Sequence, residues 1–176
     1  MSLQRMNLES KTIRLRLVEE TDASFILSLR LDDRYNQFLS KVSSDIESQK
    51  SWIRNYKIDE EEGNQFYFII ERLDGTPCGT VRVYDLKSDS FCWGSWILNE
   101  EKTKYAAIES ALLVYEFGFR NLGFSKCHFD VMKENTKVIS FHLKMGAEKN
   151  GEDDKNFYFC VDKLAIEKIK NRLKIN

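Results

Sequence analysis

The sequence predicts one domain of the mixed α/β (α+β) class, with a mainly antiparallel sheet of six to seven strands flanked by helices. Three observations support this prediction. Strand-like and helical patterns alternate along the chain. Three strand-like runs follow one another between residues 65 and 98, which is typical of an antiparallel meander. No linker, repeat or low-complexity segment divides the 176 residues, so residues 1–176 are expected to share one sizeable core.

The first three elements follow from their hydrophobic periods. Residues 13–17, IRLRL, alternate apolar and arginine side chains and predict a strand. The dipeptide Thr21-Asp22 offers an N-cap to a short apolar helix. Residues 43–64 predict a second amphipathic helix, which ends in an acidic run and the turn signal Gly63-Asn64.

The middle of the chain changes to a period of two. Residues 74–77, DGTP, join the first two strand-like runs, and residues 87–89, KSD, join the next two. Both connections are suited to β-hairpins. A long helix is expected over residues 103–123, because small and apolar side chains recur at helical spacing and Gly123 is a plausible stop.

The last third of the chain predicts a strand over residues 124–132 and a short helix over residues 135–145, which Gly146 ends. A strand over residues 156–162 then leads into a charged helix from about Lys163. The expected order is β-α-α-β-β-β-α-β-α-β, with room for a small extra strand after Gly146.

Charge and cysteine usage exclude several classes of function. The formal net charge is −1 and the pI is near 6.2, which argues against binding duplex nucleic acid or an anionic membrane. No apolar run reaches membrane-spanning length. The four cysteines form no Cys-x-x-Cys pair and have no histidine at zinc-ligand spacing. We therefore expect four buried free thiols, no metal site and a cytoplasmic location.

One junction is suited to binding an anion. The strand-like SWIL, residues 95–98, runs through a short polar loop into the long helix. A helix N-terminus with free amides can hold a phosphate or pyrophosphate. Every α/β protein has such junctions, so the feature alone is a weak signal.

Three further stretches carry a resemblance to a known family. They are GTVRVYD at residues 79–85, FCWGSWIL at 91–98 and LGFSKCHFDVMKENTKVISFHLKMGAEKNGE at 122–152. The chain resembles the GNAT superfamily of acetyl-CoA-dependent N-acetyltransferases. It is most similar to the branch of the ribosomal-protein N-terminal and nucleotide-amino-sugar acetyltransferases. The resemblance covers nearly the whole chain, and it implies a sheet whose fourth and fifth strands splay apart to admit the pantetheine arm of acetyl-CoA.

The resemblance also implies a pyrophosphate-binding loop. The family pattern Gln/Arg-x-x-Gly-x-Gly/Ala falls on Lys102, Thr103, Lys104, Tyr105, Ala106 and Ala107. Lys102 stands in for the arginine and Ala107 matches, but Tyr105 replaces the first glycine. Glycine lets the backbone approach a phosphate without an intervening side chain. If Tyr105 keeps helical backbone angles, its amide remains a donor and its ring turns to solvent or onto the adenine.

Four more residues take roles from the resemblance. Asn135 matches an asparagine that hydrogen-bonds the cofactor arm, although an ordinary helix N-cap explains it equally well. His142 lies where many members carry a tyrosine that protonates the departing thiolate, and a core histidine is the alternative. A backbone amide near Ile97 or Leu98 is expected to stabilise the developing oxyanion. His142 can protonate the thiolate, or at least hydrogen-bond it, because thiols titrate near ~8.5 and imidazolium near ~6.5.

The sequence specifies the acceptor and the general base less closely than it specifies the cofactor site. His128 and Asp130 share a strand face, which suggests a catalytic pair or, more commonly, a cross-strand polar pair. Candidate bases by residue type only are Glu71, Asp85, Glu109 and Asp130. Side chains suited to stacking on an acceptor, or simply to packing, are Trp52, Tyr56, Arg82, Tyr84, Trp93 and Trp96. Arg82 is also suited to contact a substrate phosphate, or it simply faces solvent.

The expected activity is transfer of an acetyl group from acetyl-CoA to a primary amine of a small molecule, and a nucleotide-linked amino sugar is the first choice. The alternatives are a protein N-terminus as acceptor and a non-catalytic module that binds acyl-CoA. A homodimer is possible.

Overall fold

The computed structural model of the protein describes residues 7–173. Its elements are β1 (Ile13–Leu17), η2 (Glu20–Asp22), α1 (Ala23–Arg30), α2 (Ile46–Glu61), β2 (Phe66–Arg72), β3 (Pro77–Tyr84), β4 (Ser90–Leu98), α3 (Ala106–Glu116), η3 (Phe117–Asn121), β5 (Lys126–Met132), α4 (Thr136–Lys144), β6 (Glu148–Glu152), β7 (Asn156–Asp162) and α5 (Lys163–Leu173). The expected order of elements is confirmed, and β6 is the extra strand after Gly146. No helix within residues 7–173 is long and apolar enough to cross a membrane.

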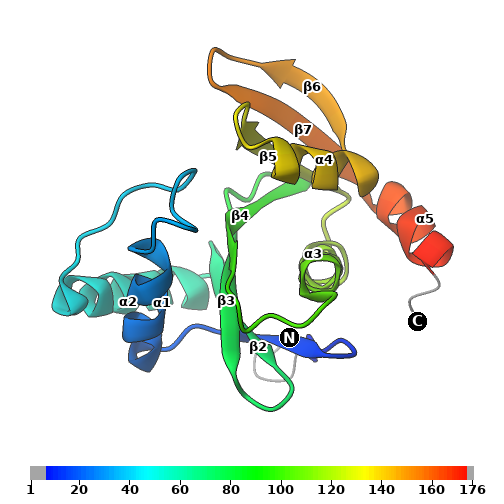
Figure 1. Cartoon of the computed structure of the whole chain (residues 1–176). Helices are drawn as coiled ribbons and strands as arrows, with labels where there is room; N and C mark the ends of the chain where they lie inside the picture. The colour runs from blue at the N-terminus through cyan, green and yellow to red at the C-terminus, as the bar shows by residue number, and fades with distance from the viewer. Residues whose placement is uncertain (1–6, 174–176) are drawn as a thin grey trace.

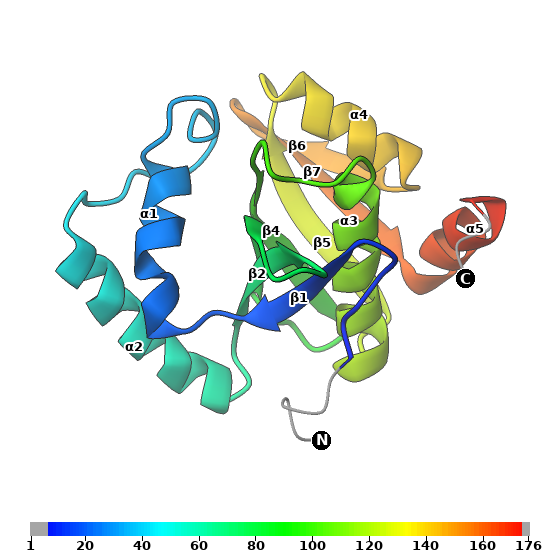
Figure 2. The same ribbon diagram turned by 60° about the horizontal axis from the view of Figure 1, so that its bottom comes forward.

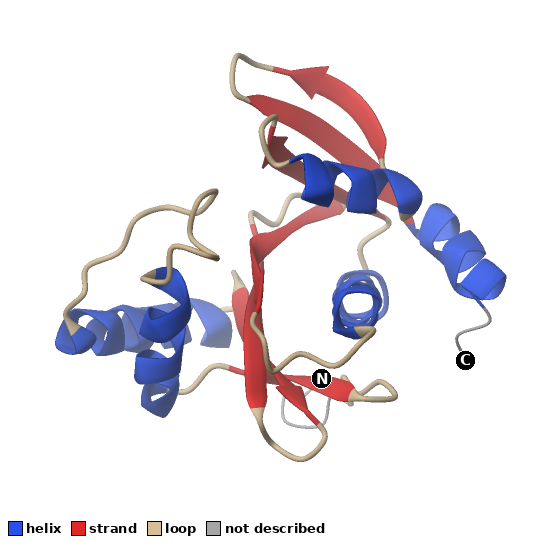
Figure 3. Ribbon diagram, viewed as in Figure 1, coloured by secondary structure: helices blue, strands red, loops and turns tan. Residues whose placement is uncertain are grey.

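All seven strands form one sheet, in the order β1-β2-β3-β4-β5-β7-β6. Every neighbouring pair is antiparallel except β4 and β5, which are parallel. The sheet separates α1 and α2 from α3 and α4 (Figures 1 and 3). The fold class predicted from the sequence is therefore confirmed.

The strand β2 shows why the sheet is covered on both faces. Its FYFII run is buried throughout, and successive side chains point to opposite faces of a strand. Phe66, Phe68 and Ile70 join the larger core, to which α3 and α5 contribute. Tyr67 and Ile69 join the smaller core under α1 and α2. A continuous apolar run is the pattern that such a doubly covered strand requires.

The sheet divides between β4 and β5. These strands pair only at Ser90↔Lys126 and Phe91↔Cys127, so the rest of β4 lacks a neighbour on that side within the described sheet. A register shift between Thr80 and Arg82 of β3 marks a bulge in the opposing strand. Ser95 of β4 lies at this bulge with a φ of 49°, in the left-handed region. The splay implied by the resemblance is therefore present.

The turn η3, which continues α3, packs closely on the start of β4. The turn is π-helical, and Gly123 follows it with a φ of 81°. A Cβ atom at Gly118 of η3 would lie 2.1 Å from the ring of Phe91. Glycine is therefore required where the turn crosses the paired end of β4 and β5.

Two local expectations need correction. Asp22 holds the N-cap position of α1 but makes no capping bond there, because its carboxylate accepts from Arg16 and from the amide of Glu19. Cys160 is half-buried, whereas the other three cysteines are buried as expected.

Candidate active site

A cleft of about 880 Å³ opens where β4 and β5 separate. We call it the splay cleft; residues 93–98 of β4, residues 129–132 of β5, residues 134–138 and His142 line it, together with Arg82, Tyr84 and the segment after α1. It thus brings together four of the predicted site residues: Ile97, Leu98, Asn135 and His142. Figure 2 shows α4 above the diverging strands, with α3 below it.

The predicted pyrophosphate loop lies beyond the C-terminal end of β4, outside the lining of the splay cleft. Tyr105 is the N-cap residue of α3, with φ −108° and ψ 18°. Its ring is 60% exposed and lies 5.3 Å from the Nζ of Lys104. The replacement of glycine by Tyr105 is therefore accommodated without a left-handed backbone, and the ring turns outward.

The start of α3 leaves backbone donors available. The amides of Lys104, Tyr105, Ala107 and Ile108 find no acceptor among residues 7–173. Such donors, with the positive end of the helix dipole and the exposed Lys102, suit a phosphate or pyrophosphate group.

A buried hydrogen-bonded clip holds this loop against β1. Glu109 is 6% exposed and accepts from the amide of Thr12 at 2.9 Å and from the Thr12 hydroxyl at 2.5 Å. The hydroxyl oxygens of Thr12 and Thr103 lie 2.7 Å apart. We call these three side chains the Thr12 clip. Sequence reasoning missed Thr12, because nothing local connects it to a loop about ninety residues away.

Asn135 occupies the N-cap position of α4 without acting as a cap. Its side chain makes no capping hydrogen bond, and its backbone has φ −84° and ψ 65°. The side chain lines the splay cleft. An amide group that is not used by its own helix is available to a ligand.

His142 lies at the wall of the splay cleft within an aromatic cluster. It is 5% exposed, and its ring centroid lies 4.2 Å from that of Phe129 and 5.4 Å from that of Trp93. Burial lowers the pKa of His142 to about 4, and Nδ1 is buried without a hydrogen-bond partner in the described chain. At pH 7 roughly one ring in a thousand is then protonated. The ring faces the cleft as a neutral imidazole.

The structure narrows the set of candidate bases. Glu71 accepts from Arg14 at 2.7 Å and from Arg16 at 3.0 Å, and Glu109 belongs to the Thr12 clip. Asp85 bonds His128, which lowers the pKa of Asp85. Only Asp130 among the four lines the splay cleft, where Glu134, which sequence reasoning did not single out, joins it.

His128 is engaged in a chain of hydrogen bonds away from Asp130. Its Nε2 lies 2.9 Å from the Oδ2 of Asp85, and its Nδ1 lies 2.5 Å from the Oγ of Ser90. With both ring nitrogens occupied, His128 is not paired with Asp130. The chain joins the β3–β4 turn to β5 at the paired end of the splay, so its geometry indicates a structural link.

The aromatic candidates for acceptor binding divide in two. Tyr56 and Trp93 are buried core residues, and the Tyr56 hydroxyl donates to Glu60 at 2.7 Å. Trp93, although buried, also lines the splay cleft, as do Trp96 and Tyr84. Trp52 lines a second pocket beside it.

Comparisons with known proteins agree with this geometry. The model of the acetyltransferase (GNAT) domain family matches residues 12–148. A solved structure described as apo FdhC, a nucleotide-linked sugar GNAT, is 57% identical, covers 96% of this chain and 97% of its own, and has a TM-score of 0.89. No curated protein sequence matches the chain.

Two more distant structures share the fold. The ribosomal-protein-S5-alanine acetyltransferase from Vibrio fischeri is 16% identical with a TM-score of 0.76, over 89% of this chain and 96% of its own. The spermidine N-acetyltransferase from Vibrio cholerae, in complex with CoA and spermine, is 16% identical with a TM-score of 0.75. The match covers 88% of this chain and 98% of the spermidine acetyltransferase chain. The family model spans most of the chain, and the 57% identical structure spans nearly all of it. The chain therefore belongs to the acetyltransferase (GNAT) family.

Proposed function

We propose that the protein transfers an acetyl group from acetyl-CoA to the primary amine of a nucleotide-linked amino sugar. The observation that carries the reaction is the splay between β4 and β5, which opens the cleft that Asn135 and His142 line. The 57% identity to a nucleotide-linked sugar GNAT supports the class of acceptor.

The residues present fit an acyl-CoA ligand. The free amides of Lys104, Tyr105, Ala107 and Ile108 suit its pyrophosphate, with Lys102, Thr103, Lys104 and Ala106 around them. The side-chain amide of Asn135, which its own helix does not use, suits the polar groups of the pantetheine arm. When bound, acetyl-CoA supplies the acetyl group as an activated thioester.

The protein's own groups would then act on the charges that develop during transfer. A backbone amide of the bulged strand, at Ile97 or Leu98, donates to the carbonyl oxygen as it gains negative charge. His142 acts as a hydrogen-bond donor to the departing sulfur from its neutral ring, since its pKa of about 4 leaves little imidazolium at pH 7. Asp130 and Glu134, at the cleft, are the carboxylates available to accept the amine's proton.

The test is an acceptor screen with acetyl-CoA and the full-length protein, read by thiol release and by the mass of the product. A panel of nucleotide-linked amino sugars is compared with spermidine and with peptides that have a free N-terminal alanine. Acetylation of a nucleotide-linked amino sugar with the highest kcat/KM is expected. Preferential acetylation of the peptide would support the protein N-terminus instead, and turnover on no acceptor despite binding of acetyl-CoA would support a non-catalytic module.

A further inference from the structure

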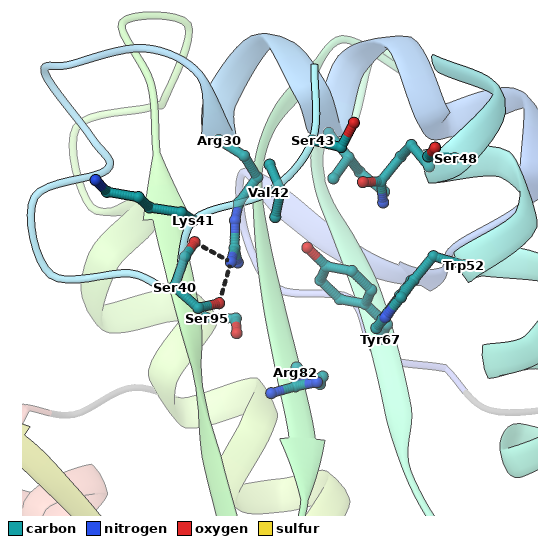
Figure 4. Close-up of a pocket in the computed structure, with 12 residues that line it drawn as sticks. Arg30, Ser40, Lys41, Val42, Ser43, Ser48, Trp52, Tyr67, Arg82 and Ser95 are labelled. Atoms are coloured by element: carbon teal, nitrogen blue, oxygen red, sulfur yellow. Dashed lines mark hydrogen bonds between the residues drawn. The ribbon is translucent and has the colours of Figure 1, made fainter. Parts of the chain in front are cut away.

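A second pocket, of about 370 Å³, lies between the sheet and the helices α1 and α2. We call it the side pocket. Four residues, Arg30, Ser40, Arg82 and Ser95, line both this pocket and the splay cleft, so the two spaces meet there. Figure 4 shows Arg30, Trp52 and Tyr67 around one space, with Arg82 at its lower side.

The side pocket is cationic in a protein whose net charge is −1. Its lining includes Arg30, Lys41 and Arg82 and contains no aspartate or glutamate. The positive charge is therefore local and uncompensated by the walls of the pocket. A cavity of this kind attracts an anion and repels a polyamine.

Each of the two arginines has a buried Nε donor without an acceptor within the described chain. The Nη2 of Arg30 donates to the carbonyl and hydroxyl oxygens of Ser40, at 2.9 and 2.8 Å, whereas its Nε is buried without an acceptor. The Nε of Arg82 is also buried without an acceptor. The Arg82 guanidinium forms no ion pair with any described residue and stacks 4.3 Å from the ring centroid of Tyr84. Buried donors without acceptors are costly, so they indicate that a partner is missing.

The chemistry of the lining selects the type of anion. A planar guanidinium group binds phosphate oxygens through parallel hydrogen bonds. Trp52, 38% exposed, adds an aromatic surface at the other side of the pocket, suited to a flat ring. Two arginines and one aromatic side chain around one space match a nucleoside diphosphate.

We propose that Arg30 and Arg82 bind the diphosphate of the nucleotide-linked acceptor in the side pocket and thereby direct its amine into the splay cleft. This inference rests on the proposed function for the identity of the acceptor. Arg82 pairs with Gly94 across β3 and β4, next to the bulge at Ser95. The diphosphate site therefore adjoins the strand segment that carries Ile97 and Leu98.

The experiment measures binding of uridine and thymidine diphosphate to the full-length protein by calorimetry, with the matching nucleosides as ligand controls. The variants are Arg30→Gln and Arg82→Gln, and Arg120→Gln is the control because Arg120 is an exposed residue on η3. We expect at least one diphosphate to bind, with affinity about 10–100-fold lower in either pocket variant and unchanged in the control. Arg82→Lys keeps the charge without the planar fork and should lie in between.

Steady-state kinetics then separate this inference from the proposed function. If a nucleotide-linked amino sugar is the acceptor, each glutamine variant should raise its KM with a smaller change in kcat. Unchanged KM with active wild-type enzyme would overturn the diphosphate site and leave the proposed function intact. Arginine-dependent binding of the diphosphates without acetylation of any sugar nucleotide would support the site and reject the proposed function. Failure of both diphosphates to bind the wild-type protein would overturn the site.

Discussion

At the scale of single residues, His142 shows how burial changes the chemistry that a sequence position implies. The unfolded chain binds a proton at His142 near pH 6.5, whereas the folded protein does so only near pH 4. The unfolded state therefore holds more protons between these values, and the free energy of unfolding falls as the pH is lowered from 6.5 to 4. The loss from this residue is on the order of 3 kcal/mol, and it is absent above the unfolded-state value of 6.5.

His142→Phe should remove this loss of stability in acid. A phenyl ring fits an aromatic cluster and has no unsatisfied Nδ1, so the variant should be at least as stable as the wild type at pH 7. Urea unfolding at pH 7 and pH 4.5 measures the difference. His128→Gln serves as the control and should retain the acid-dependent loss. If His142→Phe lost as much stability as the wild type, the ring would not be buried as neutral imidazole.

The same variant tests the role of His142 at the cleft. If the neutral ring hydrogen-bonds the departing sulfur, His142→Phe should lower kcat at least tenfold and leave the dissociation constant of acetyl-CoA nearly unchanged. Because the donor is the neutral ring, the wild-type rate should not decline between pH 6 and 8 through loss of an imidazolium proton. An unchanged kcat would leave His142 with a packing role only.

At the scale of elements, the N-terminus of α3 depends on a strand far away in the sequence. Through the clip, Thr12, which directly precedes β1, is joined to Thr103 in the loop before α3 by one hydrogen bond and to the buried carboxylate of Glu109 in α3 by two. Thr12→Val removes the hydroxyl that bridges Glu109 and Thr103 while preserving the shape of the side chain. We expect a loss of about 1–3 kcal/mol of stability, since Glu109 then lacks one donor in a buried setting.

Thr12→Val should also weaken acyl-CoA binding about tenfold, because the donors of the loop would no longer be held in place. Calorimetric titration with CoA gives this value, and Thr21→Val is the matched control, because Thr21 is an exposed residue of the short helix η2. Equal affinity for CoA in both variants would show that α3 alone orders the loop.

At the scale of the whole molecule, the sequence predicted what depends on local pattern. Alternation at residues 13–17, the turn at 74–77 and the glycine stop at Gly146 are local signals, and the elements they imply are present. The splay was predicted from the family resemblance and not from a local sequence pattern. No pattern in residues 90–98 indicates where the pairing of β4 with β5 ends. Local patterns specify elements, and long-range pairing is specified by the packing of the whole chain.

The parts that were not predicted combine distant segments. The Thr12 clip joins residues 12, 103 and 109, and the side pocket takes Arg30, Lys41 and Arg82 from three separate segments. Sequence patterns draw attention to Thr103, Glu109 and Arg82 one at a time, but no local pattern brings together the segments that meet in the clip and in the side pocket. The pKa of His142 was also beyond prediction, because His142 occupies an amphipathic helix and its desolvation comes from Phe129 and Trp93 on other elements.

The divided sheet makes the stability of the whole molecule sensitive to a ligand in the splay. The strands β1 to β4 form one half, and β5, β7 and β6 form the other. Within residues 7–173, only two residue pairs join the halves across β4 and β5. Acetyl-CoA bound between them would contact both halves of the folded state and neither in the unfolded state. At about 100 times its dissociation constant, acetyl-CoA should add about 2.7 kcal/mol to the free energy of unfolding. For 176 residues this raises Tm by about 5–10 °C.

Pantetheine at the same concentration should raise Tm less, because it lacks the pyrophosphate that suits the amides of α3. Absence of a rise with acetyl-CoA would show that the loop with Tyr105 does not hold the cofactor, whereas equal rises with both ligands would place binding in the splay alone.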